Sequence, residues 1–125
     1  MNKEFILYTE ALALKELGFD EPCFGYYHED KSLTYTNMVS QNTNSFWKIN
    51  NKIISAPLYQ QAFRWFREKY ELSSWVYNSH MDKYFYTILQ DGRIVKATES
   101  ATTFEEAELA CLIKLIQIVK GDNNE

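Results

Sequence analysis

The sequence predicts an α+β protein in which three helices pack mainly on one face of a mostly antiparallel sheet of short strands. Apolar residues recur at helical spacing in three stretches, about 8–17, 57–70 and 103–120. Between these stretches lie short runs rich in Tyr, Phe, Val and Ile, separated by polar turn residues, as is typical of strands. Helices and strands in this order favour helices segregated onto one side of an antiparallel sheet.

The length of 125 residues predicts a single domain, 1–125, whose last residues, 121–125, form a frayed tail. A net charge of −4 argues against broad nucleic-acid binding, which depends on Lys and Arg contacts to phosphate. Glu4 and Glu10 interrupt the early apolar residues, which argues against a signal peptide. The longest apolar run, 109–113, is too short to cross a bilayer. We therefore expect a cytoplasmic protein with no membrane association.

The first predicted helix ends at Gly18, which can adopt a left-handed conformation and let Phe19 fold back onto Leu14. Strands are then expected at 23–28 and 33–36, around a polar turn. Gly25 inside the first strand indicates a bulge or the close approach of another group.

The segment 37–45 is almost wholly polar and predicts a long loop, either mobile or functional. The runs 46–49 and 53–54 flank Asn50-Asn51, which suits a tight turn. This region is interpreted as a short hairpin or as an irregular approach to the second helix.

The second helix is the stretch around which the chain is organised. Pro57 suits its first turn, where a missing N–H costs nothing. Large rings recur along one side of it, whereas its opposite side is polar. The residues of the apolar stripe are Tyr59, Ala62, Phe63, Phe66 and Tyr70, and the polar side includes Gln60, Arg64, Arg67 and Glu71.

Two further strands are predicted at 74–79 and 84–90, and Asp91-Gly92 is a strong hairpin signal. A two-residue turn there pairs Leu89 with Ile94 and Ile88 with Val95. The face expected to turn toward the helices carries Tyr84, Tyr86, Ile88, Val95 and Ala97.

The third helix begins with a capping box, in which Thr103 is the N-cap and Glu106 reaches back. Gly121 is expected to end it. Glu108 falls inside its apolar sector by angle. This carboxylate is either buried or reaches out of the core near the helix start, where the dipole favours its charge.

No catalytic signature is present. His28 and His80 lack metal-ligand spacing to a second His or Cys, and they are interpreted as solvated turn residues. Cys23 and Cys111 form no CxxC pair, so reduced thiols are expected, although a disulfide stays open. There is no glycine-rich phosphate loop. We therefore predict a protein that is not an enzyme and uses no metal or cofactor.

The most suggestive binding residues are two arginines on the second helix together with the aromatic excess, 16% of all residues. An arginine fork binds phosphate or carboxylate bidentately, and rings stack on a base. The predicted ligand-binding residues are Tyr26, Trp47, Arg64, Arg67 and Tyr86. The alternative is a solvated helix face on which Glu68 and Glu71 pair with the arginines.

Three sequence blocks resemble a group of small, uncharacterised proteins encoded by bacteriophages and prophages. The blocks are ALALKELGFDEPCFGYY at 11–27, APLYQQAFRWFREKYEL at 56–72 and FEEAELACLIKLIQIVK at 104–120. No activity and no functional residue come with that family. The resemblance implies an accessory role in the host cytoplasm, of the kind that acts against host defences by occupying a host protein or sequestering a nucleotide signal.

Three hypotheses follow for function. The first is a non-enzymatic phage binding protein that sequesters a nucleotide-derived immune signal. The second is a protein–protein inhibitor or adaptor that acts on a host protein, since Tyr and Trp are typical interface anchors. The third is a small nucleotide-cleaving enzyme. Oligomeric state stays open, and a homodimer with a shared pocket is among the arrangements considered.

Overall fold

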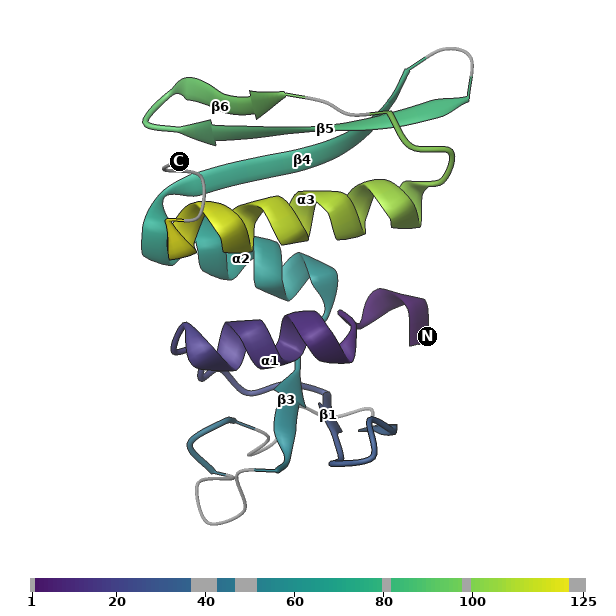
Figure 1. Ribbon diagram of the computed structural model, residues 1–125, viewed down its shortest axis with the longest axis vertical. Helices are drawn as coiled ribbons and strands as arrows, with labels where there is room; N and C mark the ends of the chain where they lie inside the picture. Colours follow the sequence, from purple (N-terminus) through teal and green to yellow (C-terminus); the bar gives the residue numbers. More distant parts are fainter. Residues whose placement is uncertain (1, 37–42, 47–51, 80–81, 98–99, 122–125) are drawn as a thin grey trace. The chain divides into compact units, whose positions relative to one another are not determined.

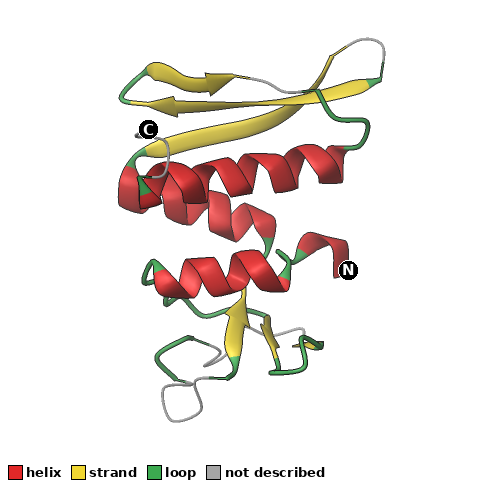
Figure 2. Cartoon of the chain, viewed as in Figure 1, coloured by secondary structure: helices red, strands yellow, loops and turns green. Residues whose placement is uncertain are grey.

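A computed structural model describes residues 2–36, 43–46, 52–79, 82–97 and 100–121. Figures 1 and 2 show short strands and α-helices, preceded by a 3₁₀ turn, η1, at Asn2–Glu4. The helices are α1 (Tyr8–Glu16), α2 (Tyr59–Tyr70) and α3 (Phe104–Lys120). The strands are β1 (Gly25–Tyr27), β2 (Leu33–Tyr35), β3 (Ile54–Ala56), β4 (Leu72–Ser79), β5 (Lys83–Gln90) and β6 (Arg93–Ala97).

The α+β class is confirmed, but the described strands form two antiparallel sheets where the sequence predicts one. Their strand orders are β2-β1-β3 and β4-β5-β6. The chain divides into two compact units, Met1–Tyr59 and Gln60–Glu125, each of which contains one sheet. A single folding domain stays a prediction.

The helix ends follow local chemistry and lie within two residues of their predicted positions. After α1, Gly18 has φ 100°, and the N–H of Phe19 donates to Leu14 O at 2.9 Å, which is the expected Schellman end. Thr103 caps α3 by accepting from the N–H of Glu106 at 3.1 Å. The Glu106 carboxylate reaches back to the N–H of Thr102, one residue earlier than the standard capping box.

In the first unit, β1 lies between β2 and β3, so it is paired on both edges. The N-terminal segment is attached to this unit by the N–H of Ile6, which donates to Pro57 O at 3.0 Å. The Tyr27 hydroxyl also donates to Ile6 O at 2.7 Å. The region 46–54 is interpreted from the sequence as a short hairpin or an irregular approach to α2, and in its described part Ile54 begins β3, which pairs with β1. Residues 47–51 lie outside the described residues.

In the second unit, α3 covers one face of the β4-β5-β6 sheet. The rings of Tyr84 and Phe104 meet edge to face, with their centroids 6.1 Å apart. Tyr86 and Ile88, which share the face of Tyr84, are buried. Leu112 and Leu115 on α3 are also fully buried. The predicted orientation of β5 is therefore right.

The β5–β6 hairpin has the predicted turn but a different register beyond it. Asp91 and Gly92 have φ values of 54° and 77°, as a type I′ turn requires. Leu89 pairs with Ile94 as predicted, but Ile88 pairs with Lys96 because a β-bulge shifts the register between Ile88 and Leu89. The extra residue leaves Val95 exposed, so its predicted place on the helix-facing side is wrong.

Gly25 is required by the close approach that the sequence indicates. A Cβ atom at this position would lie 2.9 Å from Cε1 of Phe5 and 3.1 Å from Thr34 O. We expect Gly25→Ala to destabilise the protein by roughly 1–3 kcal/mol, because the side chain and backbone around it would have to shift. Chemical denaturation of the wild type and the variant measures this loss.

A double-mutant cycle separates the Phe5 clash from the general cost of a substitution in β1. If the ring is the main obstacle, Gly25→Ala costs less in a Phe5→Leu background than in the wild type. Equal costs in both backgrounds would contradict the proposed clash.

Glu71 ends α2 with φ 59°, a left-handed conformation that disfavours residues with a Cβ. Its N–H donates to Arg67 O at 3.1 Å. We expect Glu71→Gly to stabilise the protein by about 0.5–1 kcal/mol, since glycine adopts this conformation without strain. Glu71→Ala is the matched control, because it removes the same charge but keeps the Cβ. A gain in thermal stability with alanine as large as with glycine would contradict backbone strain as the cause.

Candidate functional site

The predicted ligand-binding residues are divided between the two units. Tyr26 belongs to the first unit, whereas Arg64, Arg67 and Tyr86 belong to the second. Trp47 lies outside the described residues. Tyr86 is only 3% exposed and lies on the sheet face that α3 covers, so its ring is not accessible to an external ligand. The prediction that Tyr86 stacks on a ligand is therefore wrong for this arrangement of the sheet.

Arg64 and Arg67 are both exposed on α2, three positions apart. Residues at this spacing lie on neighbouring parts of one helix face. Neither arginine belongs to the pocket described below. Their exposure fits the alternative interpretation of a solvated helix face more closely than a phosphate clamp.

A second candidate surface is the sheet face opposite α3, which we call the open face. It is defined by Trp75 and Tyr77 on β4, Phe85 and Leu89 on β5, and Ile94 on β6. Trp75 is 46% exposed, Tyr77 39% and Ile94 65%. Ser74 and Val76 pair with Ile88 and Tyr86, which are buried on the face that α3 covers. Side chains alternate between the two faces of a strand, so Trp75 and Tyr77 lie on the open face.

The rings of the open face are held by regular strand pairing. Tyr77 lies directly opposite Phe85, and their rings stack with centroids 5.7 Å apart and an interplanar angle of 27°. Trp75 lies opposite Thr87, which is buried. Sequence reasoning assigned 74–79 to a strand but did not use its alternation, and the pattern Trp-x-Tyr was the signal that could have identified this face.

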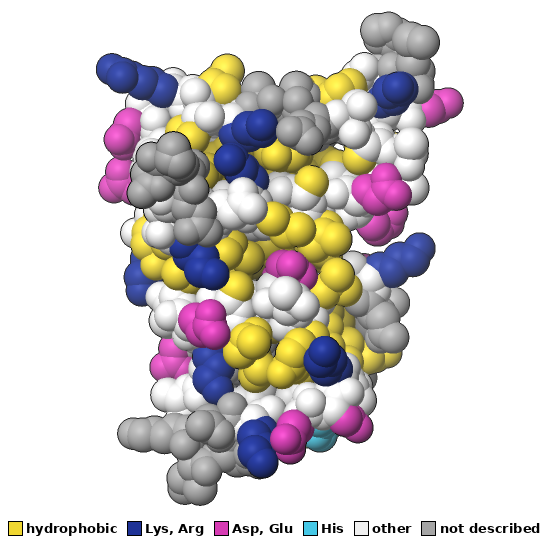
Figure 3. Space-filling view, viewed as in Figure 1, with side chains coloured by type: hydrophobic (Ala, Val, Ile, Leu, Met, Phe, Trp, Pro, Cys, Tyr) yellow, Lys and Arg dark blue, Asp and Glu magenta, His cyan; other side chains and the backbone are white. Residues whose placement is uncertain are grey.

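Charged side chains are interspersed with apolar ones in the space-filling view. Figure 3 shows Lys and Arg mixed with Asp and Glu, without a large area of one sign on the face in view. The described residues on that face therefore form no basic stripe of the kind that guides a polyanion.

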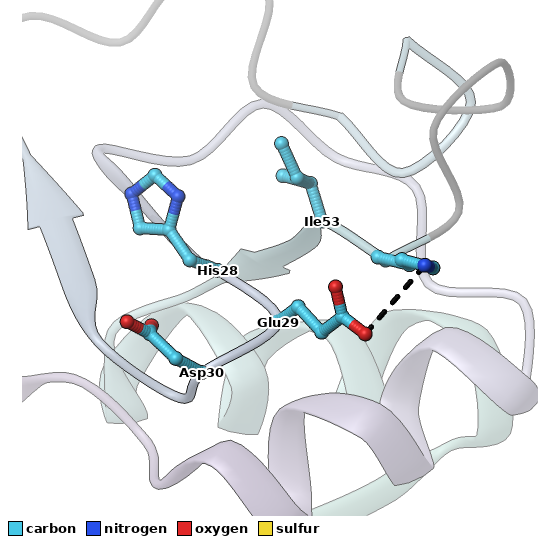
Figure 4. A pocket seen from close by; sticks show the side chains of 5 residues that line it. His28, Glu29, Asp30 and Ile53 are labelled. Carbon is cyan, nitrogen blue, oxygen red and sulfur yellow. Dashed lines mark ion pairs between the residues drawn. The ribbon is translucent and has the colours of Figure 1, made fainter.

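The first unit contains a pocket of about 410 Å³ next to the β1–β2 turn (Figure 4). It is lined by His28, Glu29, Asp30, Lys52 and Ile53. Glu29 and Lys52 form an ion pair with 3.6 Å between Oε2 and Nζ, and both side chains are mostly exposed. From the sequence, His28 is considered as a metal ligand but interpreted as a solvated turn residue.

Hydrogen bonds fix the turn that forms one wall of this pocket. The Ser32 hydroxyl donates to Asp30 Oδ1 at 2.6 Å, and the Ser32 N–H donates to the same oxygen at 3.0 Å. These bonds hold the pKa of Asp30 below its usual value. Nε2 of His28 lies 2.8 Å from the Thr34 hydroxyl, and its ring meets that of Tyr26 edge to face. Tyr26, a predicted ligand residue, therefore lies beside a residue that lines this pocket.

Two carboxylates that carry no obvious binding role are buried. Glu108 on α3 is buried, so of the two interpretations given for this residue the buried one is right. Glu10 on α1 is buried as well, and its Oε1 atom has no hydrogen-bond partner. Desolvation raises the pKa of Glu10, and the nearby Tyr27 has a raised pKa, mainly from burial and partly from the Glu10 charge.

Both cysteines are free and buried. Burial raises the pKa of the Cys111 thiol to about 12, which outweighs an opposing effect of the Ser74 hydroxyl. A thiol with such a pKa is almost entirely protonated near neutral pH and is a poor nucleophile. Cys111 therefore acts as a small apolar core residue.

Within the described ranges, no group of His, Cys, Asp and Glu has a geometry that could hold a metal ion. No helix in the same part of the chain has the length and hydropathy needed to span a membrane. Comparison of the chain with protein-family models, curated proteins and solved structures finds no match.

Glu10 predicts a specific pH dependence of stability. Its folded-state pKa is raised, so the folded protein binds this proton more tightly than the unfolded chain does. Ionisation of Glu10 therefore lowers stability above the raised pKa, and this loss disappears as the pH falls through the ordinary value of 4.5. We expect Glu10→Gln to raise the melting temperature at pH 7 but not near pH 4.

The matched control is Glu16→Gln on the same helix, because Glu16 is exposed. This control is expected to change the melting temperature little at either pH. An equal gain for Glu10→Gln at both pH values would show that desolvation of the charge is not the cause.

Proposed function

We propose that the protein is a non-enzymatic binding protein that occupies a protein partner through the open face. The observation that carries this proposal is the exposure of Trp75 and Tyr77 side by side on one strand, at 46% and 39%. Trp and Tyr are the residues most enriched among those that dominate binding energy at protein interfaces. Buried rings serve a core, whereas rings left half exposed on a regular sheet are available to a partner.

The rigidity of the site supports the same proposal. Trp75 and Tyr77 project from a strand of eight residues with unbroken pairing to β5. Tyr77 is additionally stacked on Phe85. A preorganised ring loses little conformational freedom on binding, so more of its contact energy appears as affinity.

Stoichiometric occupation of a host protein is also the role that the resemblance to phage accessory proteins implies. In that setting the protein would act in the host cytoplasm and interfere with a defence protein. Such a role requires a surface with anchors and complementary shape, and it requires no catalytic group.

The nucleotide-sequestering hypothesis stays as a second candidate because of the pocket in the first unit. A volume of about 410 Å³ lies in the range of small-molecule sites, and Tyr26 lies beside His28 at its wall. Two carboxylates, Glu29 and Asp30, also line it and would repel phosphate. This pocket therefore favours an uncharged or cationic part of a ligand over a phosphate group.

The test of the leading proposal is a quantitative pull-down from host lysate with the wild type and two variants, Trp75→Ala and Tyr77→Ala. We expect each variant to weaken capture of a specific partner by about tenfold or more, because loss of a central aromatic anchor typically costs 2 kcal/mol or more. Leu7→Ala is the control, since Leu7 is another exposed apolar residue but lies outside the open face. Equal capture by the wild type and both ring variants would refute the open face as the binding site.

A thermal-shift screen against nucleotides, cyclic dinucleotides and ADP-ribose derivatives addresses the second candidate. A ligand at a hundredfold over its Kd stabilises by about 2.7 kcal/mol. A shift that Tyr26→Ala abolishes and Trp75→Ala preserves would favour the pocket. A ligand recovered intact from denatured protein would indicate sequestration, and a cleaved one would favour the enzyme hypothesis.

A further inference from the structure

The outer edge of β4 lacks the features by which proteins usually protect a free strand. Figure 1 shows β5 between β6 and β4, and β5 is the strand that pairs with β4 in the described part of the chain. β4 has eight residues, Leu72–Ser79, with no charged residue, no proline and no break in register. An edge of this kind is a template for pairing with another strand.

The opposite edge of the same sheet, formed by β6, has features that block the addition of another strand. β6 is shorter, with five residues, and it carries Arg93 and Lys96. Its pairing with β5 includes the β-bulge at Ile88 and Leu89. Charges and bulges are the usual means of blocking edge-to-edge association. The two edges of one sheet therefore differ in the property that controls strand addition.

The sequence of β4 is nearly symmetric about Val76. Moving outward from Val76, the flanking residues are Trp75 and Tyr77, then Ser74 and Asn78, then Ser73 and Ser79. Antiparallel pairing of this strand with itself, centred on Val76, therefore places similar side chains opposite each other. Around a two-fold axis each pair occurs twice, so the aromatic pair Trp75–Tyr77 and the hydroxyl pair Ser73–Ser79 would each form on both sides of Val76.

We propose that two copies of the chain pair antiparallel along β4, with Val76 opposite Val76 of the second copy. The product is a continuous six-stranded sheet in the order β6-β5-β4-β4-β5-β6. Trp75 of each copy lies opposite Tyr77 of the other, on the open face. Since Tyr77 already stacks on Phe85 within one copy, the rings then form a ladder across the interface.

Charge does not oppose a second copy at this particular edge. Each chain carries a net charge of −4, so two copies repel each other over most approaches. The edge of β4 contributes no charge to that repulsion. Backbone hydrogen bonds and facing rings can therefore form where the electrostatic cost of bringing two identical chains together is small.

The first test measures the mass of the full chain in solution by sedimentation equilibrium at micromolar concentrations. The proposal expects a species of twice the 14.8 kDa chain mass. Ser73→Lys with Ser79→Lys places a lysine opposite a lysine on both sides of the axis and keeps Trp75 and Tyr77. We expect this double variant to weaken dimerisation by at least tenfold, and likewise the double variant with Glu at both positions.

Mixing the double lysine variant with the double glutamate variant distinguishes loss of the dimer interface from loss of folding. Lysine at 73 and 79 of one chain then faces glutamate at 79 and 73 of the other, so a one-to-one heterodimer is expected where neither variant pairs alone. Ile94→Lys is the matched control on the protected edge, and it should leave the dimer intact. A monomeric wild type, or double variants that dimerise as well as the wild type, would overturn the proposal.

A cross-link tests the register directly. In an antiparallel pair, opposite Cα atoms lie about 4.5–5.5 Å apart, which is within the range of a disulfide. Val76→Cys should therefore form a disulfide-linked dimer under mild oxidation, while the native cysteines stay buried. Ser73→Cys is the control, because the two copies of position 73 would be about 20 Å apart. Absence of the Val76→Cys cross-link, or cross-linking through Ser73→Cys, would refute this register.

This inference is independent of the proposed function, although both involve β4. The variant with lysine at 73 and 79 retains the rings of the open face. If the dimer is lost but partner capture persists, the binding proposal stands without the dimer. If the dimer forms and no partner depends on Trp75 or Tyr77, the pairing stands and the binding proposal fails.

Discussion

The packing of α3 against one face of the β4-β5-β6 sheet is the constraint on which the second unit depends. Ile88 is completely buried on that face, and Tyr84 contacts Phe104 at the start of the helix. Because a strand alternates its side chains, burial of one set commits the other set to the opposite face. The exposure of Trp75 and Tyr77 is thus a consequence of how the core is built. A register slip of one residue would bury these rings and expose the core.

The first unit depends on a different constraint, which is close contact between backbone and rings. β1 is paired on both edges, and Gly25 allows the ring of Phe5 to approach the strand. The buried Tyr27 uses its hydroxyl to bind the carbonyl of Ile6, so its polar end is satisfied. Glu10 is the exception, since its carboxylate is buried with one oxygen unpartnered. This cost in stability has no evident structural purpose.

The two candidate surfaces differ in the chemistry that they offer. The pocket beside the β1–β2 turn is lined mostly by residues with charged or polar side chains, and its carboxylates and lysine partly neutralise one another. The open face offers flat rings and aliphatic groups with regular spacing, which suits a large apolar contact. Exposed ion pairs contribute little to binding energy, whereas desolvated rings contribute much. For this reason the open face carries the proposed function.

The sequence by itself determined the helices, the turns and the α+β class, because these follow from local chemistry. Gly18, Thr103 and Asp91-Gly92 act through hydrogen bonds and backbone conformations within a few residues of themselves. Tertiary structure alone decided the division into two sheets, the bulge that moved Val95 off the helix-facing side, and the burial of Tyr86. The division into sheets and the burial of Tyr86 depend on contacts between segments far apart in the chain, and the bulge depends on the register within a hairpin. Residue type and spacing do not encode either. The predicted site was therefore built from plausible residue types, and only the register of β4 against β5 showed which rings remain exposed.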